Sequence, residues 1–279
     1  MKIEAKIIAD SISTAGKRIT TMQLCYPRFI HSEFMTHRMF SRNAMSSRAV
    51  PVAKMIEQVR SNPAMPIHWG TNQPGMQASA VLSNEMDARL GTSPRQYVKT
   101  LWEHVAEDAA NIAERMAQLG AHKQIVNRIL EPFQWMHTVV TATEWDNFFE
   151  LRCHPDAQPE INALACAMRD AMQASTPTER LEYEWHLPYV SDDERELNTT
   201  DKLRKISAAR CARVSYLKHD GTAPNTDEDL KLFERLAGGK PIHASPLEHQ
   251  ATPMTAYRSR NFIGWLQFRE VYEDNGGNM

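Results

Sequence analysis

Residues 36–48 read Thr-His-Arg-Met-Phe-Ser-Arg-Asn-Ala-Met-Ser-Ser-Arg, which gathers three arginines, one histidine, one asparagine and three serines in thirteen positions. An arginine side chain offers a planar fork of N–H donors that matches a phosphate group, and serine hydroxyls can complete such a site. The stretch therefore predicts a phosphate cradle. A solvated basic loop explains the same composition equally well.

The chain as a whole is not basic. Its 279 residues contain 32 Lys plus Arg and 34 Asp plus Glu, so the formal net charge is 32 − 34 = −2. Proteins that coat nucleic acid need a large basic excess. We therefore expect no direct nucleic-acid binding, and a bound anion must be held by clustered arginines. Long apolar runs and the apolar segment of a signal peptide are missing from the sequence, so we expect a cytoplasmic protein without a membrane span.

The four cysteines lie far apart in the sequence and form no Cys-x-x-Cys pair; they are Cys25, Cys153, Cys166 and Cys211. This spacing argues against a zinc or iron–sulfur site built from cysteine and against a disulfide framework. We expect mainly buried free thiols.

The pattern of apolar residues predicts an α+β fold, with helices forming one layer over a sheet. β-branched residues in partial alternation predict strands over 6–10 and 18–26. Two polar segments, 61–96 and 175–204, lack periodicity and are interpreted as loop insertions or linkers within a single domain spanning 1–279.

Helices are expected in the middle and near the end of the chain. Ser93 and Pro94 supply an N-cap and a proline at the first helical position. The apolar stripe of the helix that follows consists of Leu101, Val105, Ile112, Met116 and Leu119. Shorter helices are expected near 122–130 and near 229–236. Another is expected after Asp156, with an apolar face that consists of Ala157, Ile161, Leu164, Ala165, Met168 and Met172.

Arg152 ends an apolar run that begins at Trp145, so it is expected to be partly buried and to need a partner. One interpretation is a structural salt bridge, to an acid at position 146, 150 or 160. The other is a cation aimed at charge that develops on a substrate carbonyl. On composition alone the structural interpretation is favoured.

A third constellation, residues 243–249, reads His-Ala-Ser-Pro-Leu-Glu-His. Its two histidines do not have the His-Glu-x-x-His spacing that puts both on one helical face. Helix capping and loop hydrogen bonds are the preferred interpretation, and no metal site is predicted.

Five short motifs together resemble the flavin-dependent thymidylate synthase family. The family signature is Arg-His-Arg, seven residues and then Ser. In this chain His37-Arg38 is followed by seven residues and Ser46, with Arg48 two positions further on. The family motif Arg-x-x-Leu-Pro resembles residues 128–132, which read Arg-Ile-Leu-Glu-Pro. A family run Asn-Phe-x-x-Leu-Arg that leads to Ala-Gln-x-Glu-Ile resembles residues 147–152 and 157–161. The motif Ala-Arg-Val-Ser-Phe resembles residues 212–216, and His-x-Thr-Pro-Phe-Glu-His resembles residues 243–249.

The order of these motifs differs from that of the family. The segments at 212–216 and 243–249 precede the signature in the family but come last here, which resembles a circular permutation. Four positions also depart from the family pattern. Thr36 replaces the first arginine, Ala44 a usual glutamate, and Thr141 and Thr143 an asparagine and an arginine.

The resemblance implies a flavin-dependent thymidylate synthase-like fold, with an antiparallel or mixed sheet under long helices. It implies a methyltransferase in which reduced FAD, recharged by NADPH, mediates carbon delivery from methylene-tetrahydrofolate to C5 of dUMP. Family members are homotetramers, so an oligomer is expected.

By resemblance, Arg152 would contact the pyrimidine carbonyl region and His243 would lie near the folate path. The nucleotide phosphate would be held by Ser46, Arg48 and Arg128. Flavin contacts would be made by His37, Arg38, Asn43, Asn147 and Ser245.

Two alternatives remain open at this level. One is a diverged enzyme that makes a hydroxymethylated or otherwise modified pyrimidine nucleotide, because the altered flavin-side residues could permit it. The other is a nucleotide-binding scaffold that kept the fold and lost catalysis.

Overall fold

The computed structural model describes residues 2–215 and 225–276; position 216, the last residue of the motif at 212–216, lies outside them. A five-stranded sheet has the order β3-β4-β2-β1-β5. Its strands are β1 (Glu4–Ser13), β2 (Arg18–Pro27), β3 (Ser41–Ala44), β4 (Trp135–Ala142) and β5 (Thr178–Arg180).

The predicted strands at 6–10 and 18–26 are confirmed as the antiparallel pair β1 and β2. Gly16, with φ of 76°, lies in the turn between them, where a residue without Cβ adopts this conformation without strain. β5 runs parallel to β1 while the other pairs are antiparallel. The sheet is therefore mixed and the fold is α+β, as the sequence predicts.

The two faces of β4 pack against different parts of the molecule. Successive side chains of a strand point to opposite faces of the sheet. Met136 and Val140 pack in the main core. Val139 packs with Cys211 and Val214 from the C-terminal half.

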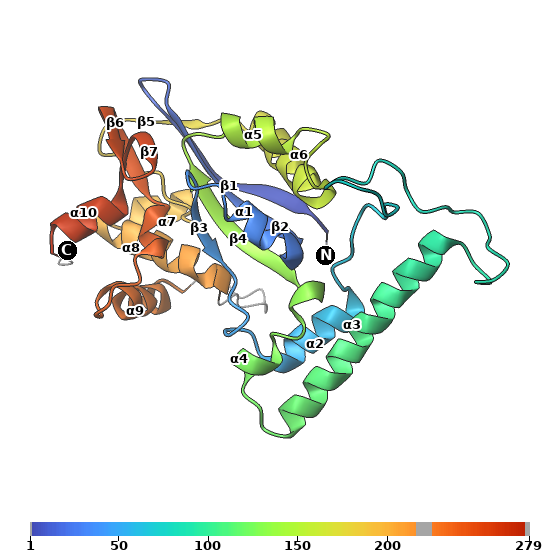
Figure 1. Cartoon of the computed structure of the whole chain (residues 1–279). Coiled ribbons are helices and arrows are strands. Elements are labelled where there is room, and N and C mark those ends of the chain that lie inside the picture. The colour runs from blue at the N-terminus through green and yellow to red at the C-terminus, as the bar shows by residue number, and fades with distance from the viewer. Residues whose placement is uncertain (1, 216–224, 277–279) are drawn as a thin grey trace.

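Helices of the main core lie on one side of the sheet, and those of the C-terminal half lie on the other (Figure 1). The first group comprises α1 (His31–Phe34), α2 (Val52–Ser61), α3 (Pro94–Gln118), α4 (Lys123–Val126), α5 (Asp146–Arg152) and α6 (Pro159–Gln173), with the short 3-10 turns η1 (Arg28–Ile30) and η2 (Glu131–Phe133). On α6 the predicted apolar face is confirmed, since Ile161, Leu164 and Met168 are buried.

α3 begins where the sequence predicts. Ser93 caps it by accepting a hydrogen bond from the backbone N–H of Gln96, and Pro94 is its first residue. The predicted apolar stripe is not its buried face, however. Small side chains at Ala106, Ala110 and Ala113 are buried, while the exposed large apolar side chains include Tyr97, Leu101, Val105, Ile112 and Leu119. Alanines let α3 approach the core closely. Most of its large apolar residues are left on the surface, but Trp102 and Met116 are half-buried against the core.

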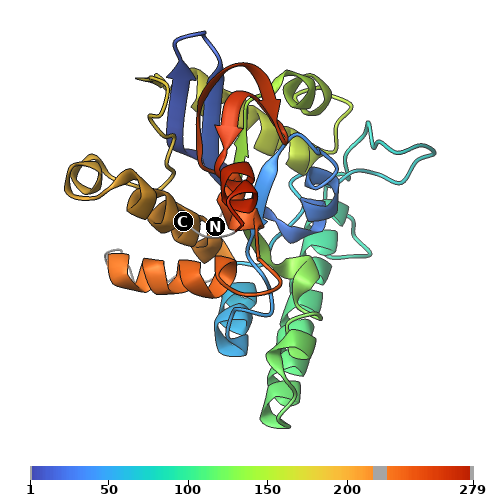
Figure 2. The same ribbon diagram turned by 90° about the vertical axis from the view of Figure 1, so that its left-hand side faces the viewer.

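The C-terminal half has a second core, which includes Leu187, Phe233 and Phe268. Figure 2 turns this side of the molecule toward the viewer. Its elements are α7 (Asp192–Leu197), α8 (Thr200–Ala212), η3 (Arg213–Ser215), α9 (Thr226–Ala237), η4 (Ser245–Glu248), β6 (Ala251–Ser259), β7 (Phe262–Gln267) and α10 (Phe268–Asp274).

The two predicted insertions differ in structure. Residues 61–96 contain little regular structure apart from isolated bridges and the helix ends. Residues 175–204 instead contribute β5, α7 and the first turn of α8, and they bury Trp185, His186 and Leu187. The second segment is therefore part of the packed fold rather than a free linker. No helix in the described part of the chain is long and apolar enough to cross a membrane.

Candidate functional site

A pocket of about 600 Å³ lies between the loop that follows α1 and helix α5. We call it the Arg152 pocket. Four of the residues predicted to contact flavin or substrate line it: His37, Arg38, Asn147 and Arg152. Phe40 and Phe148 supply apolar wall, and Glu144 and Asp146 supply acidic groups. Segments about 110 positions apart in the sequence thus meet at one cavity.

Arg152, the last residue of α5, is held on two sides. Its Nε donates to Nε2 of His37 at 3.0 Å, and its Nη1 donates to Oε1 of Glu33 in α1. The salt-bridge partners expected from local sequence, at positions 146, 150 and 160, are therefore wrong. The true partner is 119 positions away in the chain and is set by the packing of α1 beside α5, which no local pattern encodes.

His37 is a neutral imidazole at neutral pH. Burial, with the nearby cations of Arg152 and Arg42, lowers its pKa to about 4. Its ring packs edge-on against Phe148, with centroids 4.8 Å apart. Since Nε2 accepts from Arg152, the remaining ring nitrogen is the one that carries hydrogen. His37 therefore fixes the guanidinium of Arg152 without adding charge to the pocket.

The loop that contains Ser46 and Arg48 rests on the turn that contains Arg128. Nδ2 of Asn127 donates to the carbonyl oxygens of Ser47 and Val50, at 2.7 and 3.0 Å. The structure thus brings together the two segments predicted to hold a phosphate, although they lie 80 positions apart in the sequence. The roles of the individual residues stay predictions.

Glu131 and Arg28 are residues of this loop region that the sequence reasoning missed. Oε1 of Glu131 accepts from Nη2 of Arg28 and Nη1 of Arg128, both at 2.9 Å, and from the hydroxyl of Ser47 at 3.3 Å. Glu131 stands where the family motif Arg-x-x-Leu-Pro has leucine. A carboxylate in place of that leucine was the available signal, and it gathers donors that could otherwise face an anion.

The remaining predicted contacts lie apart from the Arg152 pocket. Asn43 is on β3 and 8% exposed. His243 and Ser245 are exposed, next to or in η4. None of the three lines the Arg152 pocket. Among the described residues no group of three or more His, Cys, Asp or Glu side chains could hold a metal ion.

Thr141 and Thr143, which differ from the family pattern, make hydrogen bonds inside this fold. Thr143 Oγ1 accepts from the backbone N–H of Ile263 in β7 at 3.0 Å. Thr141 Oγ1 hydrogen-bonds Nδ1 of His249 and the hydroxyl of Thr21, at 2.8 and 2.7 Å. Both threonines therefore fasten the C-terminal half to the sheet, and do not line the Arg152 pocket.

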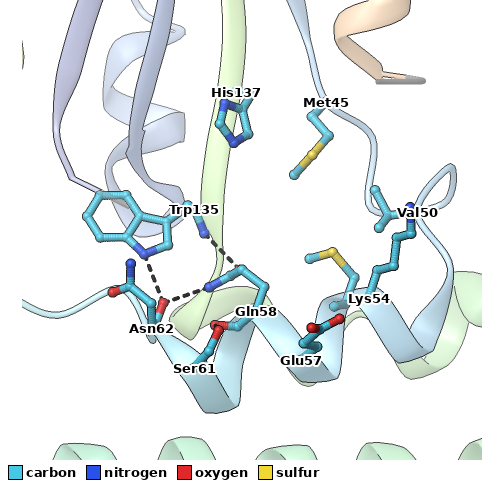
Figure 3. Close-up of a pocket in the computed structure, with 10 residues that line it drawn as sticks. Met45, Val50, Lys54, Glu57, Gln58, Ser61, Asn62, Trp135 and His137 are labelled. Atoms are coloured by element: carbon cyan, nitrogen blue, oxygen red, sulfur yellow. Dashed lines mark hydrogen bonds between the residues drawn. The ribbon is translucent and has the colours of Figure 1, made fainter. Parts of the chain in front are cut away.

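A second pocket, of about 410 Å³, opens between α2 and β4. Figure 3 shows His137 and Met45 facing it from one side and α2 closing the other. Part of its polar lining is internally bonded: Asn62 O accepts from Nε1 of Trp135 and from Nε2 of Gln58. Met45 and Val50, which flank the Ser46–Arg48 loop, also line it, so the predicted phosphate loop begins and ends at its edge.

Residues 14–178 match the model of a protein family described as thymidylate synthase complementing protein. This match spans more than half of the chain and ends before the motifs at 212–216 and 243–249. No curated protein matches the chain.

Solved structures to which the chain is similar include a UMP/dUMP methylase PolB from Streptomyces cacaoi bound with 5-Br UMP. It has 18% sequence identity and a TM-score of 0.48, over 61% of this chain and 88% of that chain. Another is Thymidylate Synthase X (ThyX) from Helicobacter pylori with FAD and dUMP. It has 14% identity and a TM-score of 0.39, over 55% of this chain and 67% of that chain.

Proposed function

Because the chain belongs to the family of thymidylate synthase complementing proteins, we propose that it is an enzyme that transfers one carbon to C5 of a pyrimidine deoxynucleotide. The observation that supports this most directly is the convergence of His37, Arg38, Asn147 and Arg152 on one pocket. The first three are expected to contact flavin and the last to contact the pyrimidine, so one cavity would bring the two reactants together.

The Arg152 pocket fits the edge of a flavin ring. His37, Arg38 and Asn147 offer N–H donors, and Phe40 and Phe148 offer apolar surface. Asn43 and Ser245 lie elsewhere, so the pocket would hold the ring edge and not the whole dinucleotide. In this proposal reduced FAD, recharged by NADPH, supplies the redox chemistry, and methylene-tetrahydrofolate supplies the carbon.

Arg152 would polarise the pyrimidine. Arg152 lines the pocket, and its guanidinium is held in a fixed position by His37 and Glu33. Donors fixed before reaction stabilise negative charge as it develops on a ring oxygen. That charge accompanies the nucleophilic character of C5, and the neutral His37 keeps the donor geometry without a second full charge beside the substrate.

The phosphate would be held on the Ser46–Arg48 loop by Arg48, Arg128 and the loop N–H groups, with Arg28 as an added cation. Among the described residues, none of this loop lines the Arg152 pocket. We propose that the two halves of the nucleotide site combine across subunits of a homotetramer. The exposed apolar side chains of α3, such as Leu101, Val105 and Ile112, offer surface for such contacts.

The test is flavin binding followed by product analysis. The purified chain should bind about one FAD per subunit at micromolar concentration, with absorbance near 450 nm as for other flavins. Incubation with nucleotide, methylene-tetrahydrofolate and NADPH should give a product in which methyl replaces hydrogen, so that mass spectrometry finds it heavier by one CH2 unit. A hydroxymethyl product would redirect the proposal to the diverged enzyme. Absence of flavin binding by well-folded protein with nucleotide present would refute the flavin assignment.

A further inference from the structure

A cavity of about 650 Å³ lies between η3 and α9 in the C-terminal half of the molecule. We call it the α9 pocket. Its described lining consists of Arg213 from η3 and, from α9, Glu228, Lys231, Leu232, Arg235 and Leu236. The α9 residues recur at the spacing that places side chains on one side of a helix. α5, which carries Arg152, lies on the other side of the sheet (Figure 1), so this pocket is separate from the Arg152 pocket.

Arg213 is held in place by a buried carboxylate. Its Nε donates to Oδ1 of Asp229 at 2.8 Å, and the Asp229 side chain is only 1% exposed. The other oxygen of Asp229 accepts from Nε of Arg210 at 2.8 Å, and Arg210 pairs in turn with Glu194. Two carboxylates therefore offset two arginines in this network. Arg213 contributes a positioned fork of N–H donors to the pocket, and the net charge comes from α9.

Lys231 and Arg235 carry this charge. They lie four positions apart on α9, both are exposed, and neither has a hydrogen bond or ion pair within the described part of the chain. Like charges at this spacing repel each other. Glu228 is three positions before Lys231, but it is two helical turns, or about 10 Å, from Arg235. One carboxylate thus faces three cations in the described lining, and an anionic ligand would complete the balance.

We propose that the α9 pocket binds a phosphate chain, such as that of a nucleoside triphosphate. The guanidinium fork matches phosphate oxygens, and lysine adds a point charge. Because Lys231 and Arg235 lie a helical turn apart, a chain of phosphates can reach both, whereas one phosphate reaches fewer. Leu232 and Leu236 supply apolar wall beside the cations. The site goes beyond the proposed function and does not depend on it. The alternative is a cationic helix face that binds only solvent.

The experiment measures binding of inorganic tripolyphosphate, orthophosphate and ATP by calorimetry on the full-length chain. All proteins carry Arg48→Ala, so that the Ser46–Arg48 loop contributes little. Tripolyphosphate should bind at least about 10-fold more tightly than orthophosphate, because it engages more cations. Adding Lys231→Ala or Arg235→Ala should weaken its binding by roughly 5- to 20-fold. Arg115→Ala removes an exposed arginine from the last turn of α3 and should leave the affinity unchanged.

The remaining outcomes separate the sources of the phosphate chain from failure of the site. Equal affinities for tripolyphosphate and ATP support recognition of the chain alone, and tighter binding of ATP supports a nucleotide whose ring meets the leucine wall. Equal losses in Arg115→Ala and Arg235→Ala overturn the site, because the effect would then be one of general charge. Failure of folded protein to bind tripolyphosphate at millimolar concentration also overturns it. Either failure leaves the proposed function standing, since flavin binding and turnover are measured separately.

Discussion

The hydroxyl of Thr141 in β4 lies 2.8 Å from Nδ1 of His249, which follows η4. The same hydroxyl contacts Thr21, whose oxygen lies 2.8 Å from Nε2 of His186, and Nδ1 of His186 lies 2.9 Å from Ser11. This chain of buried hydrogen bonds crosses from the sheet into the C-terminal half. Both imidazoles are fully buried. Burial disfavours their protonated form, so the two halves are joined through neutral histidines.

Acid should weaken this junction. Burial lowers the pKa of both His186 and His249 to about 3, against about 6.5 in an unfolded chain. Above about pH 6.5 both histidines are neutral in the folded and in the unfolded chain, so their full contribution to stability is present there. Below about pH 6.5 the unfolded chain binds protons that the folded chain excludes. The free energy of unfolding should fall by roughly 1.4 kcal/mol per pH unit for each histidine until about pH 3.

Urea titrations between pH 7 and 4 measure this slope. His249→Asn keeps an amide near the position of Nδ1 and removes the titrating ring, so its slope should be shallower by about one proton. His104→Asn, on the exposed surface of α3, is the matched control and should retain the wild-type slope. Identical slopes in all three proteins would contradict the assignment of acid sensitivity to this junction.

Arg152→Lys should fold normally and lose most of its turnover. Lysine keeps the positive charge and can pair with Glu33, but it lacks the planar fork that donates to His37 and the substrate together. Loss of one preorganised donor lowers the rate by roughly 10²–10³. Turnover with the nucleotide substrate and the thermal midpoint should be measured on the same samples. Near-wild-type turnover would reduce Arg152 to a structural ion-pair partner.

Arg48 and Arg128 should contribute to binding of the phosphate group and not to binding of the nucleoside or of flavin. Replacing Arg48 or Arg128 by alanine should weaken binding of a nucleoside monophosphate by about 1.5–3 kcal/mol. The corresponding nucleoside should bind wild type poorly and show little further loss, and flavin binding should change little. Unchanged monophosphate affinity in both variants would require another site for the phosphate.

Glu131 should oppose binding of the phosphate at the Ser46–Arg48 loop. Its carboxylate occupies donors of Arg28, Arg128 and Ser47, which a phosphate would otherwise engage. Glu131→Gln removes the competing charge, so monophosphate affinity should rise several-fold at low ionic strength. Calorimetry at two salt concentrations tests this, and a fall in affinity would show that Glu131 instead holds the arginines in position.

Cys25 and Cys153 should react slowly with thiol reagents and be dispensable for turnover. Burial raises the pKa of Cys25 to about 12 and, with Cys166 nearby, that of Cys153 to about 11. Little thiolate therefore forms at pH 8, so labelling by a thiol reagent should be slow. Cys153→Ala should retain turnover. Complete loss of turnover in a folded variant would imply a nucleophilic role that the proposed flavin chemistry does not need.

Sequence alone determined the features that depend on neighbours along the chain. The strands at 6–10 and 18–26, the start of α3 at Ser93-Pro94 and the buried face of α6 follow from alternation, capping and helical period. The family likewise follows from short motifs, and the match over residues 14–178 confirms it.

The tertiary structure decided which side chains form ion pairs and hydrogen bonds with one another. Arg152 pairs with Glu33 and not with an acid on its own helix, Arg128 and Arg28 share Glu131, and Thr141 meets His249. Most of the predicted apolar stripe of α3 faces outward, because alanines fit closer to the core. Each of these contacts joins groups brought together only when whole elements pack, and a buried polar group takes whichever partner that packing supplies. Local sequence fixes which elements form, whereas the distances between elements fix which side chains can satisfy one another.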